Sequence, residues 1–268
     1  MFGSRERYRY DHYTWPEIRE VVKRQPVVVL PIGSVEDHGP HLPLDTDHFL
    51  ITAVCEEAAR RIPEEMLLLP PVPYGFADHH LDFPGPITIR PAHLEAFVLD
   101  ITTSVARHGF SKILLADGHG SNMPILELVA RRTVLETKAL CAAFIWPNLI
   151  LEVLREIRES EYPGGLAHAG ELETSVYLWL NSEAVQREQA VKDLHEHPSK
   201  FHWQDSTGGG PLRFMDWWSR ISHTGTVGDP TVASAEKGQK CFEACVERLI
   251  ALVREFRRWE IRPRVDHH

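Results

Sequence analysis

The sequence contains few cysteines, and they form no recognisable pattern. There are four of them, Cys55, Cys141, Cys241 and Cys245, and none belongs to a C-x-x-C motif. Cys241 and Cys245 stand four positions apart in a segment that reads as a helix, so they could face the same side. We interpret all four as small buried apolar side chains of a protein in a reducing cytosol. The cysteines therefore give no indication of disulfides.

Basic charge and long apolar runs are also scarce. Lys and Arg number 29 against 38 Asp and Glu, which gives a formal net charge of −9. This balance argues against a nucleic-acid partner. No apolar run is long enough to span a bilayer, and residues 1–13 are charged and aromatic, without the apolar region of a signal peptide. We therefore expect a cytoplasmic protein with neither a nucleic-acid nor a membrane partner.

Acids and histidines are instead concentrated in residues 30–49, LPIGSVEDHGPHLPLDTDHF. This stretch follows PVVVL, an apolar run of strand length, and it precedes a helical pattern over residues 50–61. Ligands of open α/β sheets bind at the carboxyl ends of the strands, where this loop would lie. Carboxylates mixed with imidazoles suit zinc, manganese or iron, so the stretch predicts a metal site. The alternative is a solvated acidic loop. The candidate groups are Glu36, Asp37, His38, His41, Asp45, Asp47 and His48.

Apolar runs and amphipathic stretches alternate along the first half of the chain, which predicts a parallel sheet covered on both faces by helices. Prolines in the second strand place it at an edge or at an end of the sheet. The predicted strands are 27–30, 67–72, 112–116 and 140–145, and the predicted helices are 13–23, 50–61, 91–108 and 123–138.

The second half is less regular. Helices are predicted at 168–180 and 233–259, and an apolar-periodic helix follows a loop within 147–159. Residues 186–210 are polar and read as an excursion from the core. Residues 214–221, FMDWWSRI, are aromatic and could cover the site or contact another subunit. Neither a linker nor an internal repeat is evident, so we expect a single domain over residues 1–268.

Two motifs would place potential metal-binding side chains at the predicted sheet edge. Glu36 and His38 are two residues apart, and side chains at i and i+2 of an extended backbone point to the same side. Gly39 and the nearby prolines would let the loop double back, so that Asp47 meets this pair. The motif DGHGSN follows a strand, and its glycines would permit a tight turn that holds His119 at the same edge. A phosphate-binding loop is the alternative, but the required glycine and lysine spacings are missing.

The motif HAGELETS, residues 168–175, is the third candidate. His168 would lie near a helix start, with Glu173 in the first turn. Acids are favoured there by the helix dipole, so an ordinary helix N-terminus is an equally good interpretation of this motif alone.

These motifs, together with YGFADHHLDFPG and GTVGDP, resemble those of the creatininase (creatinine amidohydrolase) family, over most of the chain and in the expected order. The resemblance implies a three-layer α/β/α fold with a mostly parallel sheet and a dinuclear metal site. It also implies a homo-oligomer, often a hexamer, and hydrolysis of a cyclic amide or another non-peptide C–N bond. By position, the implied metal ligands are Glu36, His38, His119 and, as the bridge between two ions, Asp47.

Two positions depart from the family pattern. Creatininase has a glutamate two residues after the histidine of DGHG, where this chain has Ser121. The departure argues against creatinine as the substrate and leaves the second ion short of a ligand, for which Glu173 is the natural replacement. Pro86 stands where threonine commonly follows FPG. Relatives without the glutamate include formamide deformylases, a peptide-processing branch and a hydrolase of cyclic keto-inositols.

On this resemblance we expect a hydrolase with two divalent ions per chain (Zn, Mn or Fe). A metal-bridged hydroxide would attack the substrate carbonyl, because the ions lower the pKa of bound water. His168 would carry the proton to the leaving group, since imidazole titrates near neutrality. Glu173 could act as the acid or base in place of a ligand. The expected ligand groups are Glu36, Asp47 and His119 for one ion, and His38, Asp47 and Glu173 for the other.

Other interpretations stay open. The same fold and metals could open a keto-inositol of the 3-dehydro-scyllo-inosose type by C–C cleavage, or remove a formyl group from an amide. A non-catalytic metal-binding protein would hold ions without turnover. A nucleotide-binding Rossmann protein would need a glycine fingerprint that is missing. His80 and Trp146 are further candidates for substrate contacts, with a structural role as the alternative.

Overall fold

The computed structural model describes residues 7–195 and 199–268. At its centre is a four-stranded sheet in the order β2-β1-β3-β4, in which all neighbouring strands are parallel. The predicted α/β class and parallel sheet are therefore confirmed. The strands are β1 (Val27–Ile32), β2 (Met66–Leu68), β3 (Lys112–Asp117) and β4 (Leu140–Ile145).

Strand β2 lies at an edge, as its prolines predicted, but it is shorter than the predicted 67–72. Pro70 and Pro71 have no N–H to donate to a ladder, so regular pairing stops before them. A single bridge resumes beyond them, where Val72 N donates to Pro31 O at 2.9 Å.

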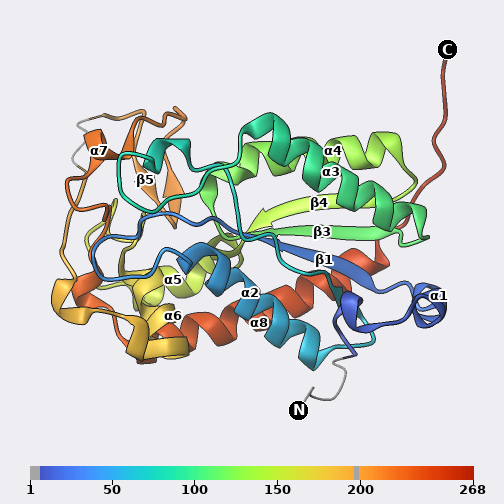
Figure 1. Ribbon diagram of the computed structural model, residues 1–268, viewed down its shortest axis with the longest axis horizontal. Coiled ribbons are helices and arrows are strands. Elements are labelled where there is room, and N and C mark those ends of the chain that lie inside the picture. Colours follow the sequence, from blue (N-terminus) through green and yellow to red (C-terminus); the bar gives the residue numbers. More distant parts are fainter. Residues whose placement is uncertain (1–6, 196–198) are drawn as a thin grey trace.

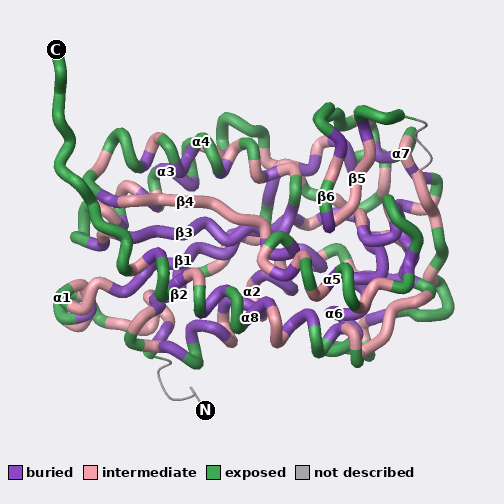
Figure 2. Tube along the Cα trace, turned by 180° about the vertical axis from the view of Figure 1, so that it is seen from behind, coloured by how far each residue is buried: buried purple, intermediate pink, exposed green. Residues whose placement is uncertain are grey.

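Alternate strand residues face opposite sides of the sheet and enter two separate apolar clusters. Val27 and Val29 pack against α2 (Thr46–Arg61), α6 (Glu171–Asn181) and α8 (Ala235–Arg258). Val28 and Leu30 pack on the other side, against the helices α1 (Trp15–Lys23), α3 (Pro91–Arg107) and α4 (Met123–Glu136). Figure 1 shows the resulting three layers, and Figure 2 shows that the inner strands are buried. The three-layer prediction is confirmed.

Several helices begin a few residues later or earlier than predicted, and two of these changes affect the site. Helix α2 begins at Thr46 instead of residue 50, because Phe49 N already donates to Asp45 O at 2.7 Å. Asp47 therefore lies in its first turn. Helix α6 begins at Glu171 instead of residue 168. Ala169 has a positive φ of 51° and cannot be part of a right-handed helix, so His168 belongs to the preceding loop.

The predicted excursion over residues 186–210 contains a small antiparallel hairpin of β5 (Gln204–Asp205) and β6 (Gly208–Gly209). Residues 196–198 of that excursion lie outside the described part. The hairpin, α5 (Leu151–Ile157) and α7 (Trp218–Ile221) gather beyond the carboxyl ends of the strands, at the end of the molecule where α6 also begins (Figure 1). This segment therefore covers the sheet edge where the sequence predicted a site.

All four cysteines are free, and three of them are buried, as expected for small core residues. Within the described ranges, no helix has both the length and the apolarity required to cross a membrane.

Candidate metal centre

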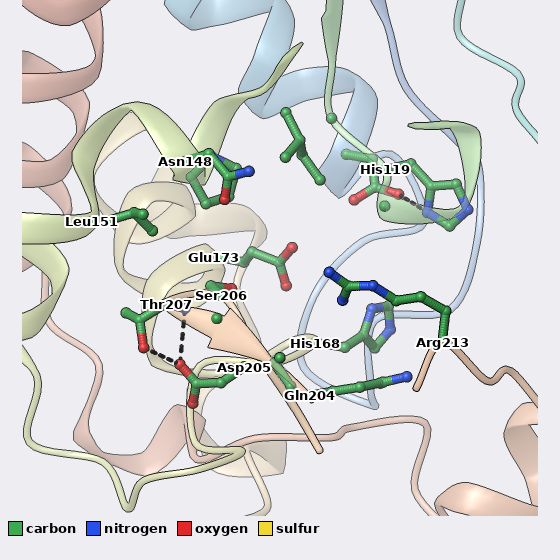
Figure 3. Close-up of a pocket in the computed structure, with 18 residues that line it drawn as sticks. His119, Asn148, Leu151, His168, Glu173, Gln204, Asp205, Ser206, Thr207 and Arg213 are labelled. Carbon is green, nitrogen blue, oxygen red and sulfur yellow. Dashed lines mark hydrogen bonds and ion pairs between the residues drawn. The ribbon is translucent and has the colours of Figure 1, made fainter. Parts of the chain in front are cut away.

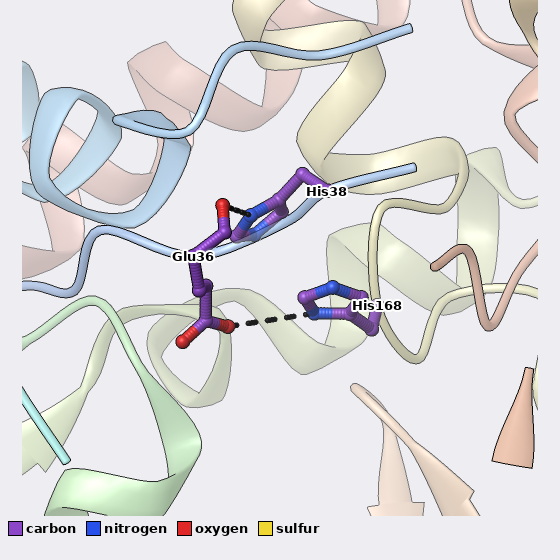
Figure 4. Close-up of side chains that lie close together, drawn as sticks. All are labelled: Glu36, His38 and His168. Atoms are coloured by element: carbon purple, nitrogen blue, oxygen red, sulfur yellow. Dashed lines mark hydrogen bonds and ion pairs between the residues drawn. The ribbon is translucent and has the colours of Figure 1, made fainter. Parts of the chain in front are cut away.

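The loop after β1 aims two side chains inward, as their spacing predicted. Glu36 and His38 are completely buried, and the Nδ1 of His38 lies 3.4 Å from the backbone carbonyl oxygen of Glu36. A carbonyl can only accept a hydrogen bond, so Nδ1 carries the proton and the Nε2 lone pair faces the interior. Figure 4 shows the ring of His38 against that carbonyl, while the Glu36 carboxylate points toward His168. Gly39, with a φ of 65°, reverses the chain after this pair.

His119 is fixed in the same way at the end of β3. Its Nε2 donates to the backbone oxygen of Phe76 at 2.9 Å, so its Nδ1 faces the interior with a lone pair. The turn is held by Asp117, whose Oδ1 accepts from His119 N and from Asn122 Nδ2, both at 3.1 Å. The role expected for the two glycines is wrong, because neither has a positive φ. Gly118 is needed for close approach: a Cβ there would lie 2.4 Å from the backbone oxygen of Asp47.

Asp47 connects the two histidines through different oxygens. Its Oδ1 lies 3.2 Å from His38 Nε2, and its Oδ2 lies 3.1 Å from His119 Nδ1. The same Nδ1 is 3.0 Å from Glu36 Oε2. The structure thus brings together all four residues that the sequence proposed from its first half.

These pairs of atoms are close enough for ion pairs, but they do not form hydrogen bonds. Both carboxylate oxygens of Glu36, Oδ2 of Asp47 and Nε2 of His38 are buried and have no hydrogen-bond partner. Orphaned buried polar atoms are costly. Lone pairs that converge from several sides on shared points suit cations, so this donor set fits divalent metal ions. Among the residues that the structure describes, there are four triads whose donor atoms lie within 4.8 Å of one another. Two of them are Glu36 with Asp47 and His119, and His38 with Asp47 and Glu173.

Glu173 reaches the cluster from α6. Its Oε2 lies 3.9 Å from His38 Nε2 and also accepts from Ala169 N at 2.6 Å. The second contact ties Glu173 to the loop just before the helix, so this acid has a structural contact as well as a place beside the cluster. Its neighbour Glu171 points elsewhere, to Lys237 Nζ at 2.6 Å and to the backbone of residues 159 and 160.

His168 lies above Glu36, with its Nε2 donating to the backbone oxygen of Asp37 at 2.8 Å. Its Nδ1 therefore carries a lone pair, 3.9 Å from Glu36 Oε1. Burial and the nearby His38 hold the pKa of His168 well below its usual value, so this ring is neutral. A neutral imidazole beside the cluster can accept a proton.

The two remaining triads both include His168, with Glu36 and His38 in one and with Asp37 and His80 in the other. The second of these is partly engaged by internal hydrogen bonds, although Asp37 Oδ2 is buried without a hydrogen-bond partner. His80 Nδ1 lies 2.7 Å from Asp37 Oδ1, and His168 Nε2 bonds the Asp37 carbonyl. Burial lowers the pKa of His80 and raises that of Asp37 to about 7. We therefore interpret His80 and Asp37 as residues that hold the side chains around Glu36 in place.

Charge within the cluster explains its protonation. Burial opposes a charge on His38, but Asp47 and the other carboxylates outweigh it and raise its pKa to about 10. Burial likewise opposes a charge on His119, and Glu36 and Asp47 raise its pKa well above the usual value. Burial raises the pKa of Glu173 to about 7. Because a metal needs the lone pairs of these groups, ions must displace protons from them.

Two cavities of about 560 and 820 Å³ open onto the cluster. Figure 3 shows the smaller one, with Glu173, His168 and His119 around it. Trp218 lines the larger one and is buried, donating from Nε1 to Gly225 O at 2.9 Å, so the aromatic segment 214–221 does cover the site. Sequence reasoning missed three polar residues that line both cavities, namely Asn148, Gln204 and Arg213. They come from a short 3-10 helix, a two-residue strand and a loop, which are too short to show a periodicity in the sequence.

Other candidates have different surroundings. Trp146 is buried in the core beneath α8, where its carbonyl accepts from Cys245 Sγ at 3.5 Å, and it lines neither cavity. Its proposed substrate contact is therefore not supported. Ser121 lines the larger cavity and lies 3.2 Å from His79 Nε2.

Comparison with known proteins places this site in a family. The creatininase (creatinine amidohydrolase) family matches residues 11–253. The chain belongs to the creatininase family. It is therefore a hydrolase of the metal-dependent amidohydrolase type, and its buried His, Glu and Asp clusters provide candidate metal sites.

Creatininase-family relatives with different names are similar to this chain. A mycofactocin precursor peptide peptidase of Mycobacterium tuberculosis is 32% identical over 252 residues, covering 89% of this chain and 87% of the relative. A 3-dehydro-scyllo-inosose hydrolase of Thermotoga maritima is 28% identical over 259 residues, covering 90% and 81%. The creatinine amidohydrolase of Pseudomonas putida is 29% identical over 265 residues, covering 90% and 94%. Family membership alone therefore does not name the substrate.

Solved structures agree with this fold. A creatininase with Mn superposes with a TM-score of 0.79 at 26% identity, covering 92% of this chain and 98% of that one. A mutant creatininase of the Zn–Zn type gives a TM-score of 0.76, also at 26% identity, covering 92% and 97%.

Proposed function

We propose that this protein is a dinuclear metal-dependent hydrolase that cleaves a cyclic amide or another non-peptide C–N bond. The observation that carries the proposal is the arrangement around Asp47. Its two carboxylate oxygens face two different histidine nitrogens, at 3.2 and 3.1 Å. Each nitrogen is oriented by a backbone carbonyl near its other ring nitrogen. A carboxylate with one oxygen toward each of two histidines is what a bridge between two ions requires.

The donor set assigns ligands to two divalent ions, of zinc, manganese or iron type. Glu36, Asp47 and His119 would hold the first ion, and His38, Asp47 and Glu173 would hold the second. Three protein ligands per ion leave open positions, as in catalytic zinc sites. When bound, the two ions would supply an activated water at neutral pH and stabilise negative charge on a substrate oxygen.

The chain itself provides proton transfer and shelter. The Nδ1 of His168 carries a lone pair beside Glu36, and His168 belongs to no proposed ligand group. We infer that it accepts the proton of the attacking water and returns it to the leaving nitrogen, because its ring is neutral and held by Asp37 O. Trp218 lines the larger cavity and the 204–209 hairpin lines the smaller one, so both cover this side of the cluster.

The second candidate is opening of a cyclic keto-inositol by C–C cleavage, and it is favoured by the similarity to the inosose hydrolase of Thermotoga maritima. It would use the same ligands and the same histidine. Deformylation of a formamide is a further alternative of the same chemistry. Ser121, which stands where creatininase has a glutamate, supports a substrate other than creatinine.

We also propose a homo-oligomer, with the hexamer common in the resembled family as the expected state. Phe214, Met215 and Trp217 remain 48, 44 and 43% exposed on the aromatic segment, and such clustered apolar area suits a subunit contact. Light scattering at micromolar concentration should give a mass several times that of the 30.6-kDa chain. A monomer would contradict the oligomer.

Metal analysis combined with a substrate panel tests the proposed function. Purified protein should contain about two divalent ions per chain, by the ligand count above. It should hydrolyse at least one member of a panel of cyclic amides, formamides, inosose-type ketones and short peptides, and chelation should abolish this activity. Full activity after complete removal of metal would overturn the mechanism. Bound metal with no turnover on the whole panel would instead favour a metal-binding protein.

A further inference from the structure

The two cavities meet over the candidate metal centre. Both are lined by His119 and His168 on the metal side, and by Gln204 and Arg213 on the side formed by the 204–213 segment. A substrate that reaches the cluster must therefore pass between these two walls.

Arg213 is the only lysine or arginine among the described residues that line either cavity. Within the described part of the chain, no hydrogen bond or ion pair engages its guanidinium. The one acid that shares this wall, Asp205, is already committed to Arg158 Nη2 at 2.6 Å. Arg213 thus brings a positive charge with five N–H donors to the substrate cavity, and these donors are free to bind a ligand.

The hairpin gives this side chain a defined place. Gln204 and Gly209 are paired across β5 and β6, just before Arg213. A Cβ on Gly209 would lie 3.0 Å from Arg213 Nη1, so the glycine leaves room for the guanidinium. Figure 3 shows the Arg213 side chain directed into the cavity, near the ring of His168 and the amide of Gln204.

The charge of Arg213 is not required to balance the metal ligands. The three carboxylates of the proposed ligand groups, Glu36, Asp47 and Glu173, carry less negative charge than two divalent cations carry positive charge. Arg213 is exposed beside a centre that would be net positive, and the acid on its own wall is already paired, so its guanidinium is available to an anionic group of a substrate.

We propose that Arg213 determines specificity by binding a carboxylate of the substrate, so that the substrate class is an acidic amide. The inference rests on the proposed function, because it takes the cavity over the metal ligands as the substrate site. The planar guanidinium fork matches a carboxylate in bidentate geometry, and the Gln204 amide provides a neighbouring donor. Because this contact lies away from the reacting bond, it should contribute to binding and not to the chemical step.

Matched pairs of cyclic amides test this. Hydantoin and dihydrouracil are neutral, and hydantoin-5-acetate and dihydroorotate are their counterparts with a carboxylate. Calorimetric titration of the metal-loaded protein should show the acidic member of at least one pair binding about 10- to 100-fold tighter, as expected for charge-assisted hydrogen bonds. In Arg213→Gln the two members of the pair should bind about equally, and Arg213→Lys should keep part of the preference. With any acidic substrate that turns over, KM should rise and kcat should stay near the unmutated value.

Arg220→Gln is the matched control, because Arg220 lies nearby in the sequence, in α7, but outside the cavities and pairs with Asp216 at 2.9 Å. It should leave the preference unchanged. Gly209→Ala is a second variant that should weaken acid binding by displacing the guanidinium, without altering its charge. Metal content should be equal in all four variants.

The inference is overturned if the unmutated protein binds both members of each pair equally, or if Arg213→Gln keeps the preference. Unchanged metal content and hydrolysis of neutral substrates would show that only this inference has failed. Absence of metal and of all turnover would mean that the proposed function has failed instead.

Discussion

The two proposed ion sites are built differently, although they share Asp47. The first takes its ligands from the loop after β1, the first turn of α2 and the turn after β3, and all of them are buried. The second needs Glu173 from α6, whose side chain is 16% exposed. The first site is therefore formed by segments at the carboxyl edge of the sheet. The second also depends on how α6, from the other half of the chain, packs against that edge.

Specific contacts fix that docking. Thr174 of α6 is bonded to His41 Nε2 at 2.9 Å, and the hydroxyl of Tyr177 donates to Asp45 Oδ1 at 2.9 Å. On its other side α6 packs closely on α8, where a Cβ at Gly238 would lie 1.9 Å from Ser175 O. The loop that carries the first site thus also positions the helix that completes the second. Asp45, which the sequence analysis included among the candidate groups, belongs to this support.

Replacing Asp47 should affect both sites alike, and we expect it to cause the largest loss of activity and metal. Asp47→Ala should abolish activity and lower the metal content at both sites, because one carboxylate serves both ions. Asp45→Ala is the control and should keep both ions, losing about 1 kcal/mol of stability with the Tyr177 hydrogen bond. Elemental analysis and thermal unfolding measure both effects. An active Asp47→Ala beside an inactive Asp45→Ala would show that the ligand is assigned to the wrong aspartate.

Glu173→Gln should affect the second site without affecting the first. The substitution keeps the shape of the side chain and removes its charge. As a ligand, Glu173 predicts the loss of about one ion per chain together with activity. As a general acid or base, it predicts two retained ions and a fall in turnover of roughly 10²- to 10⁴-fold. Metal content measured beside kcat distinguishes the two. Full metal with full activity would refute both roles and leave Glu173 only its structural contact with Ala169 N.

Metal affinity should depend on pH at both sites, because His119 at the first site and His38 at the second both have raised pKa values. With pKa values of about 10 for His38 and about 7 for Glu173, both groups hold protons at low pH that the second ion must displace. Its affinity should therefore fall about 10-fold per unit between pH 10 and 7, and about 100-fold per unit below pH 7. Competition with a chelator across this range measures the slope. An affinity independent of pH would contradict the assignment of His38 as a ligand.

Asn122→Ala should weaken the first site alone, with the smallest effect. Asn122 Nδ2 donates to Gly33 O and Asp117 Oδ1, and its Oδ1 accepts from Phe76 N, the residue whose carbonyl orients His119. Loss of such supporting contacts costs about 10- to 100-fold in metal affinity. Equal weakening of both ions in a chelator titration would mean that the variant disturbs the fold as a whole.

The sequence predicts the first site better than the second for a physical reason. Buried strands are visible as apolar runs, and the two-residue period of extended backbone places Glu36 and His38 on one side. Glu173 could be proposed only through the family resemblance and the departure at Ser121. Its position depends on α6 docking across a long separation in sequence, and no local pattern records that.

Arg213 shows where sequence reasoning ends. It lies after a two-residue hairpin in a segment rich in glycine and polar residues, with no period that assigns it to a face. Its place in the cavity follows from the pairing of Gln204 with Gly209 and from the space beside that glycine. The fold class was predictable because it depends on many residues, whereas a single wall residue depends on one turn.

The most direct test of the two-ion arrangement is anomalous diffraction from crystals loaded with manganese or zinc. The structure predicts two peaks per chain, on opposite sides of the Asp47 carboxylate. For zinc, each should lie about 2.0–2.2 Å from its ligand atoms. One should be bound by Glu36 and His119, and the other by His38 and Glu173. A single peak, or a peak bound by Asp37, His80 and His168, would contradict this assignment.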